Sequence, residues 1–174
     1  RSRVPEGLDA VDTDANKVAA KVGDVTITRT LDGVSIISTS QEITMEAENQ
    51  LELKKLKVCV NDNCDTVRDG DKVSDIKPGD QIDVVFQVKN GFRDNDAEDI
   101  EIQNVEAFVL NNDADFDVDE GDEFGDISPN DVDELTLSFE VADDVGDGTV
   151  TMSAWVEGED ENGAKHGELF EIRL

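Results

Sequence analysis

Apolar and polar residues alternate with a period of two through most of the sequence after residue 50. In QIDVVFQVK, four apolar side chains from Ile82 to Val88 fall on one side, and ELTLSFEV repeats the pattern. This period is that of a half-buried β-strand. The alternation slips at Gln103-Asn104, which predicts a β-bulge. Turn residues, and no amphipathic helix of useful length, separate the segments, so the sequence predicts an all-β fold, an antiparallel sandwich of two sheets.

The first fifty residues divide into two parts that precede this pattern. Residues 1–23 begin as a polar, irregular stretch, and we interpret them as an N-terminal arm that could donate a strand to a neighbour. Residues 24–50 alternate around Asp32-Gly33, a strong signal for a two-residue turn, and predict an N-terminal β-hairpin. Residues 51–174 then supply the strands of the sandwich.

Two stretches of the sandwich resemble a known family. DIKPGDQIDVVFQVKN and ISPNDVDELTLSFEVADDVGDGTVTMSAWVEG are similar to archaeal and bacterial cell-surface immunoglobulin-like modules, the CARDB-type and S-layer-like domains. The resemblance covers roughly residues 51–174. It implies an immunoglobulin-like sandwich with an extracellular structural or adhesive role and no catalytic residues.

Acidic residues dominate the charge of the chain. It holds 44 acids against 15 bases, a net charge of −29, and Asp outnumbers Glu by 27 to 17. Such a field repels nucleic acid and anionic lipid, so we expect neither as a partner. Salt at 1 M would shorten the Debye length to about 3 Å and relieve the self-repulsion. We therefore expect a halophilic source, an archaeon, with the loading of divalent cations as the alternative.

The most acidic stretch is NNDADFDVDEGDEFGD, in which eight of sixteen residues are carboxylates. A period of two places its first four aspartates on one strand face, with neighbours about 7 Å apart along the chain. These residues are Asp113, Asp115, Asp117 and Asp119. Calcium needs about six to eight oxygens at ~2.4 Å around one point. We therefore interpret the stretch as a solvated acidic face.

A calcium site of a looser kind stays open in the same stretch. The EF-hand template fails, because its required glycine falls on Val118 or on Glu120, depending on where the loop starts. Asp119, Glu120 and Asp122 remain as potential ligands. Calcium is thus the one cofactor that the sequence leaves open.

The only two cysteines lie in VCVNDNCDTV. A two-residue turn at Asn61-Asp62 would place Cys59 opposite Cys64 at a non-hydrogen-bonded position, with Cα atoms ~4.5 Å apart. That separation suits a disulfide. We predict this bond rather than free thiols, and hence an oxidising compartment.

The sequence offers little for catalysis. It has no Tyr and a single His, His166, in the turn-like ENGAKHG, so we expect a solvent-exposed histidine and no general base. Pairs of carboxylates carry no information in a chain with 44 acids. No phosphate-binding glycine loop is present. We expect a protein that is not an enzyme.

Four apolar residues are predicted to lie at contacts between chains. Three belong to NKVAAKV near the N-terminus, and the fourth shares its strand face with Ser153 and Glu157 rather than with the inward set. We expect this tryptophan either under the N-terminal hairpin or against another subunit. The four residues are Val18, Ala20, Val22 and Trp155.

The longest apolar run, residues 107–110, is too short to span a membrane, and no signal peptide is visible. We expect the mature form of a secreted, cell-surface protein. Our leading hypothesis is a non-enzymatic subunit of an extracellular filament, pilus- or thread-like, or of a surface layer, a homopolymer joined by strand-edge pairing of the N-terminal arm. The alternative is an adhesion module, with or without calcium, that binds polysaccharide or a partner cell.

Overall fold

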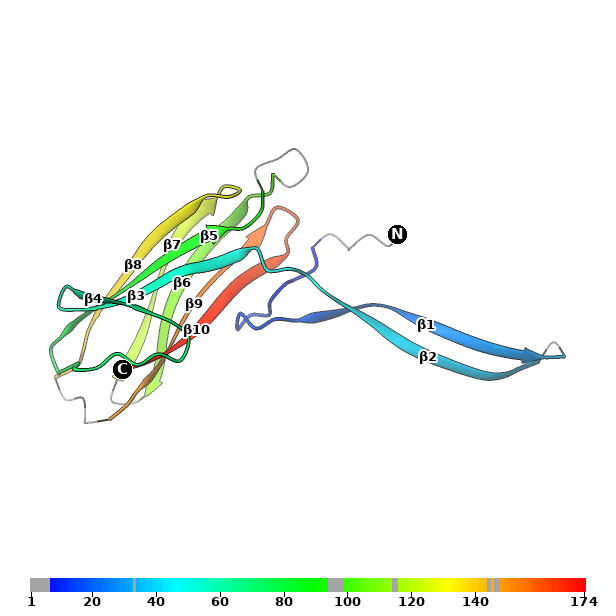
Figure 1. Cartoon of the computed structure of the whole chain (residues 1–174), viewed down its shortest axis with the longest axis horizontal. Coiled ribbons are helices and arrows are strands. Elements are labelled where there is room, and N and C mark those ends of the chain that lie inside the picture. The colour runs from blue at the N-terminus through cyan, green and yellow to red at the C-terminus, as the bar shows by residue number, and fades with distance from the viewer. Residues whose placement is uncertain (1–6, 33, 94–98, 114–115, 144, 146–147) are drawn as a thin grey trace.

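A computed structural model describes residues 7–174 except 33, 94–98, 114–115, 144 and 146–147 (Figure 1). The described residues form strands and turns and contain no helix that could cross a bilayer. The all-β prediction is confirmed. The strands are β1 (Ala19–Leu31), β2 (Val34–Glu46), β3 (Leu51–Val60), β4 (Asn63–Val67), β5 (Gln81–Asn90), β6 (Ile102–Asp113), β7 (Phe116–Ile127), β8 (Val132–Glu140), β9 (Thr151–Asp160) and β10 (Lys165–Arg173).

Two antiparallel four-stranded sheets, in the orders β4-β3-β5-β8 and β10-β9-β6-β7, pack face to face. Alternate residues of each strand point into the core, so Phe86 of β5 and Met152 of β9 are fully buried. The predicted antiparallel sandwich is confirmed, and the inward set of QIDVVFQVK is the one that the sequence indicated.

The predicted bulge in β6 is also present. Pairing with β7 shifts between Ile102 and Val105, and Asn104 adopts a positive φ of 50°. The Asn104 N–H donates to Asp126 Oδ1 at 3.0 Å. The shift returns Val105 and Ala107 to the core face.

The disulfide forms as predicted. Asn61 and Asp62 take positive φ values of 46° and 69°, as a tight hairpin turn of this type requires. Cys59 therefore pairs directly with Cys64, their Cα atoms lie 3.9 Å apart, and the sulfur atoms are bonded.

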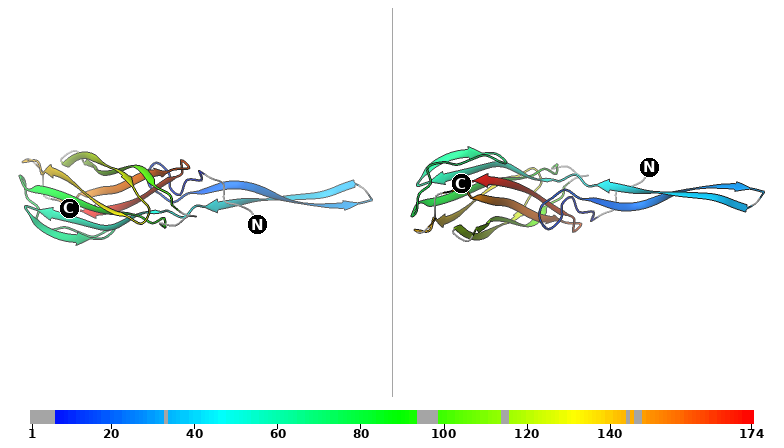
Figure 2. Two further views of the ribbon diagram at one scale, coloured as in Figure 1. Left: turned by 90° about the horizontal axis from the view of Figure 1, so that it is seen from above. Right: turned by 90° about the horizontal axis from the view of Figure 1, so that it is seen from below.

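Strands β1 and β2 form a separate two-stranded sheet that projects away from the sandwich (Figures 1 and 2). Their pairing runs from Ala19–Glu46 to Leu31–Val34. The turn thus lies between Leu31 and Val34, where the sequence predicted it. The structure begins the hairpin at Ala19, so residues 19–23 belong to β1.

Residues 9–18 lie against the start of β10 in the same chain. The Ala10 N–H donates to the Lys165 carbonyl at 2.8 Å, and the Lys165 N–H donates to Asp9 Oδ1 at 3.0 Å. Ala10 and Val11 are buried by this contact. The chain then reverses around Asp12, whose carboxylate accepts the Asn16 N–H, and enters β1.

Candidate assembly surfaces

One face of the β1–β2 hairpin is apolar and open to solvent. Val25, Ile27 and Ile43 are 47%, 70% and 42% exposed. Strand pairing places all three on one side, because Val25 faces Gln41, Ile27 faces Thr39 and Ile43 faces Gly23. The opposite side carries hydroxyls, among which the Thr26 Oγ1 donates to Ser40 Oγ at 3.4 Å. We call Val25, Ile27 and Ile43 the hairpin apolar face.

The distal part of the hairpin, residues 25–41, lacks the acidic coat of the rest of the chain. Residues 25–41 contain one acid, Asp32, and one base, Arg29, whereas the whole chain carries 44 acids in 174 residues. A two-stranded ribbon is at best marginally stable alone in water. The hairpin therefore combines low charge and uncovered apolar area with a need for a packing partner.

A groove opens at the end of the sandwich opposite to the hairpin, between β4 and residues 71–75. Its volume is about 480 Å³. Valines of β3, β4 and the segment that follows β4 form its floor, and three carboxylates together with Lys72 line its rim. We call this feature the β4 groove, with floor residues Val58, Val60, Val67 and Val73 and rim residues Asp65, Asp71 and Asp75.

The backbone edge of β4 is free along this groove. Val60 pairs with Asn63 across the turn, so by antiparallel alternation the N–H and C=O groups of Cys64 and Thr66 point away from β3. Within the part of the chain that the structure describes, these groups bind no other segment. Free edges of this kind accept another strand.

The edge of β10, in contrast, is covered at both ends. Residues 9–18 bind its start, as described above. At its end, the Gly70 N–H donates to the Glu171 carbonyl at 2.7 Å and the Val73 N–H donates to the Arg173 carbonyl at 2.8 Å. At β4, therefore, unpaired backbone groups lie directly beside the apolar floor of the β4 groove, whereas the backbone of β10 is covered.

An aromatic row lies on the outer face of the second sheet. Trp155 of β9 stacks on Phe108 of β6, with ring centroids 5.0 Å apart and an interplanar angle of 22°. Gly121 of β7 leaves room for this ring, because a Cβ there would lie 2.7 Å from Phe108 Cδ1. Trp155 is on the outer face as predicted, but Phe108 rather than the N-terminal hairpin packs against it.

The remaining predicted interface residues lie at the base of the hairpin. Val18, Ala20 and Val22 are half-buried. The Val18 N–H donates to the Ala10 carbonyl at 3.2 Å. Their contact with a second chain stays a prediction.

The proposed calcium ligands lie on β7. Asp119, Glu120 and Asp122 are exposed, and Asp122 Oδ1 accepts the Glu123 N–H at 2.9 Å. Among the described residues, no three His, Cys, Asp or Glu side chains are grouped so as to hold a metal ion. The acidic stretch also includes Asp115, which lies outside the described residues.

The expectation of an exposed His166 was wrong. This residue is only 3% exposed, because β10 begins at Lys165 and His166 is its first inward position. Its Nδ1 accepts the Gln50 N–H at 3.2 Å, and its Nε2 lies 3.5 Å from Asp160 Oδ2. Burial lowers the pKa of His166, and the nearby Asp160 carboxylate opposes that shift only in part.

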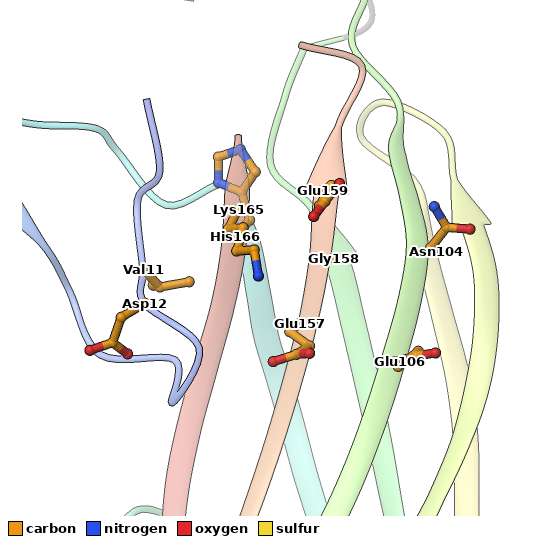
Figure 3. Close-up of a pocket in the computed structure, with 9 residues that line it drawn as sticks. All are labelled: Val11, Asp12, Asn104, Glu106, Glu157, Gly158, Glu159, Lys165 and His166. Carbon is orange, nitrogen blue, oxygen red and sulfur yellow. The ribbon is translucent and has the colours of Figure 1, made fainter. Parts of the chain in front are cut away.

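A small pocket of about 220 Å³ adjoins His166 (Figure 3). Carboxylates of Glu106 and Glu157 line it from the outer face of the sheet, while the His166 ring is turned away from them. Deeper at the same edge, Glu168 accepts the Leu53 N–H at 2.6 Å, and burial raises the pKa of this carboxyl. The buried His166 and the half-buried Glu168 thus each accept a backbone N–H from the segment that follows the hairpin.

Comparison with known proteins assigns no family. No family model and no curated protein matches the sequence. Among solved structures, the chain is similar to the sporulation control protein Spo0M from Bacillus subtilis, with 16% identity and a TM-score of 0.34. The match covers 68% of this chain and 48% of that one, so the chain spans about half of that protein.

Proposed function

We propose that the chain is a secreted, non-enzymatic structural subunit of an extracellular filament, pilus- or thread-like, or of a surface layer. The observation that carries this proposal is the hairpin apolar face, which is uncovered and nearly free of acids on a chain with a net charge of −29. Apolar faces that a monomer leaves open mark contacts with other molecules. A subunit of a homopolymer meets such a partner in each neighbouring copy.

The chemistry of the rest of the chain supports an extracellular setting. The Cys59–Cys64 disulfide is consistent with an oxidising environment. The carboxylate surface would keep an assembly hydrated in the brine of a salt-adapted archaeon, where salt screens its repulsion. An immunoglobulin-like module of the CARDB or S-layer kind would suit this role.

Strand-edge pairing would join the subunits. The arm, residues 1–23, is one donor, and its contact with β10 could be exchanged for the same contact in a neighbour. Val18, Ala20 and Val22 would then lie at the junction. Such unlike surfaces meet head to tail and do not close on themselves unless a ring forms.

Electron microscopy in concentrated and in dilute salt tests this function. The full chain should form filaments or sheets in concentrated salt, and deletion of residues 1–23 should abolish them if the arm is the donor. Unchanged assembly of the deleted chain would remove the arm from the contact. A chain that stays monomeric in brine, or turns over a substrate, would refute the structural role.

Recognition of a polysaccharide or a partner cell is a second candidate, favoured by the aromatic row. Trp155 and Phe108 offer an aromatic surface next to the facing carboxylates of Glu106 and Glu157, which could accept hydroxyl hydrogens. Sedimentation with insoluble polysaccharide tests it. Trp155→Ala should abolish binding, while the exposed control Val132→Ala should not.

A calcium-loaded form of this second candidate is tested by calorimetric titration. A stoichiometric site lost on Asp119→Asn/Asp122→Asn substitution would support it. Heat of dilution alone, at the same protein concentration, would contradict it.

A further inference from the structure

We propose that the β1–β2 hairpin of one copy docks along the free edge of β4 in a second copy and places Val25 and Ile27 in the β4 groove. This inference rests on the proposed homopolymer and names the hairpin, in place of the arm, as the donor that would join its subunits. The docked hairpin extends the sheet β4-β3-β5-β8. In such β-augmentation, main-chain hydrogen bonds hold the added strand and alternate side chains fill pockets.

The composition of the hairpin suits burial in a partner. An unpaired charge is costly to bury, so a surface that becomes an interface is expected to lose its carboxylates. Residues 25–41 contain no carboxylate except that of Asp32 at the turn. The hairpin apolar face then supplies the area to be covered.

The acceptor offers both things that an incoming strand needs. The outward N–H and C=O groups of Cys64 and Thr66 provide a backbone ladder beside the opening. The valines of the groove floor provide apolar contact directly next to that ladder. An added strand would therefore pair and bury side chains in one step.

The hairpin apolar face and the β4 groove match in length and are complementary in charge. Val25, Ile27 and Arg29 occupy every second position of β1, on one face, and span about 13 Å of extended chain. The five residues of β4 span about the same length. With Val25 and Ile27 on the valine floor, Arg29 reaches the acidic rim, where opposite charges favour this register.

The positions of the two surfaces select a second copy as the occupant. Figure 1 shows the hairpin leaving one end of the sandwich and the β3–β4 turn at the opposite end, and Figure 2 shows the same arrangement from two further directions. The hairpin thus points away from the groove of its own chain. A donor at one end and an acceptor at the other repeat head to tail.

A mixing experiment in concentrated salt tests this pairing. Ile27→Asp places a charge on the docking face, and Thr66→Pro removes an outward N–H from β4 and blocks its edge. The matched controls are Thr28→Asp, on the opposite face of the same strand, and Thr66→Val, which keeps the N–H. Sedimentation velocity measures the mass of each variant and of the equimolar mixture of the two blocked variants.

We expect the wild type and both controls to polymerise and each blocked variant to remain a monomer of 19.0 kDa. The mixture should yield a species of twice that mass and nothing larger, because one intact donor meets one intact acceptor. A monomeric mixture of folded variants, or normal polymers of Thr66→Pro, would overturn the inference. If Thr66→Pro forms normal polymers, the subunits still polymerise but use an acceptor other than β4. A monomeric wild type, in contrast, would refute the proposed function itself.

Photo-crosslinking covers a failure of Thr66→Pro to fold. A benzophenone side chain at position 27 of the full chain, irradiated in concentrated salt, should react with residues 58–75 of another copy, as read by mass spectrometry. Crosslinks between two hairpins, or from the hairpin to the row of Trp155 and Phe108, would overturn the inference. Crosslinks within one chain would do the same.

Discussion

The sandwich and the hairpin use the same strand chemistry and treat their apolar residues in opposite ways. Phe86 in β5 has no exposed surface, while Ile27 in β1 is 70% exposed. The sandwich closes its apolar faces against each other and presents carboxylates to water. The hairpin does neither, since its apolar face is open and residues 25–41 hold a single acid. The sandwich thus buries its apolar core within one chain, whereas the docking that we propose would bury the apolar face of the hairpin in a second chain.

Truncation of one apolar side chain in each region should give the largest contrast. Phe86→Ala should lower the free energy of unfolding of the monomer by about 3–5 kcal/mol, because it opens a cavity in the core. Ile27→Ala should change it by less than about 0.5 kcal/mol, as for most exposed sites. Denaturant unfolding of the monomer, followed by Trp155 fluorescence, measures both. A loss above about 1 kcal/mol for Ile27→Ala would mean that the hairpin packs on its own sandwich.

Removal of the disulfide should have the next largest effect. Cys59→Ala/Cys64→Ala should cost the sandwich about 2 kcal/mol, because the short loop is no longer closed in the unfolded chain. Urea unfolding with and without reductant measures this change. The wild type should unfold at a lower urea concentration with reductant than without it, whereas the variant should not respond to reductant. Equal midpoints of the wild type in the two conditions would contradict the account.

Glycine-to-alanine substitution compares the regions at the backbone. Gly121→Ala should cost about 1–2 kcal/mol and shift the Trp155 emission, because the new Cβ displaces the Phe108 ring. Gly23→Ala in the hairpin meets no described heavy atom within 4 Å and should be neutral. Thermal unfolding with fluorescence detection compares the two variants. Equal effects would show that Gly121 is not needed for the stack.

Acidification should produce the smallest effect, through His166. Its pKa is lower in the folded state than in the unfolded state, so the unfolded chain binds more protons as the pH falls below about 6.5. The free energy of unfolding therefore has its full value, as far as His166 is concerned, above that pH. Below it, the free energy of unfolding declines by at most about 1.4 kcal/mol per pH unit.

The difference in Tm between the wild type and His166→Asn from about pH 7.5 to 5.5 isolates this residue, because Glu168, whose pKa is raised by burial, is present in both proteins. The variant should show the flatter profile. Parallel profiles would remove His166 as the source of the decline.

Local patterns predicted the elements of the fold better than the surfaces between them. Period two identified the strand faces, and the spacing of Cys59 and Cys64 around a two-residue turn identified the disulfide. His166 was misplaced because ENGAKHG resembles a turn, whereas the turn ends at Ala164 and a strand follows. The low acid content of residues 25–41 was readable in the sequence and was the missed signal for the hairpin face.

The β4 groove could not be predicted from local pattern. It exists because residues 70–73 bind the end of β10 and leave β4 uncovered, a contact between segments about a hundred residues apart in the chain, such as Gly70 and Glu171. The stacking of Trp155 on Phe108 likewise depends on the register of β6 against β9. The pattern of either segment alone does not show which distant segment it will pair with.

Hydrogen–deuterium exchange of the monomer and of the assembled protein tests most directly whether the hairpin is completed by another chain. We expect the backbone amides of residues 25–41 to exchange rapidly in the monomer and to become protected on assembly, together with those of Cys64 and Thr66, while β5 is protected in both states. A hairpin that is already protected in the monomer, or that still exchanges rapidly in the polymer, would contradict the account.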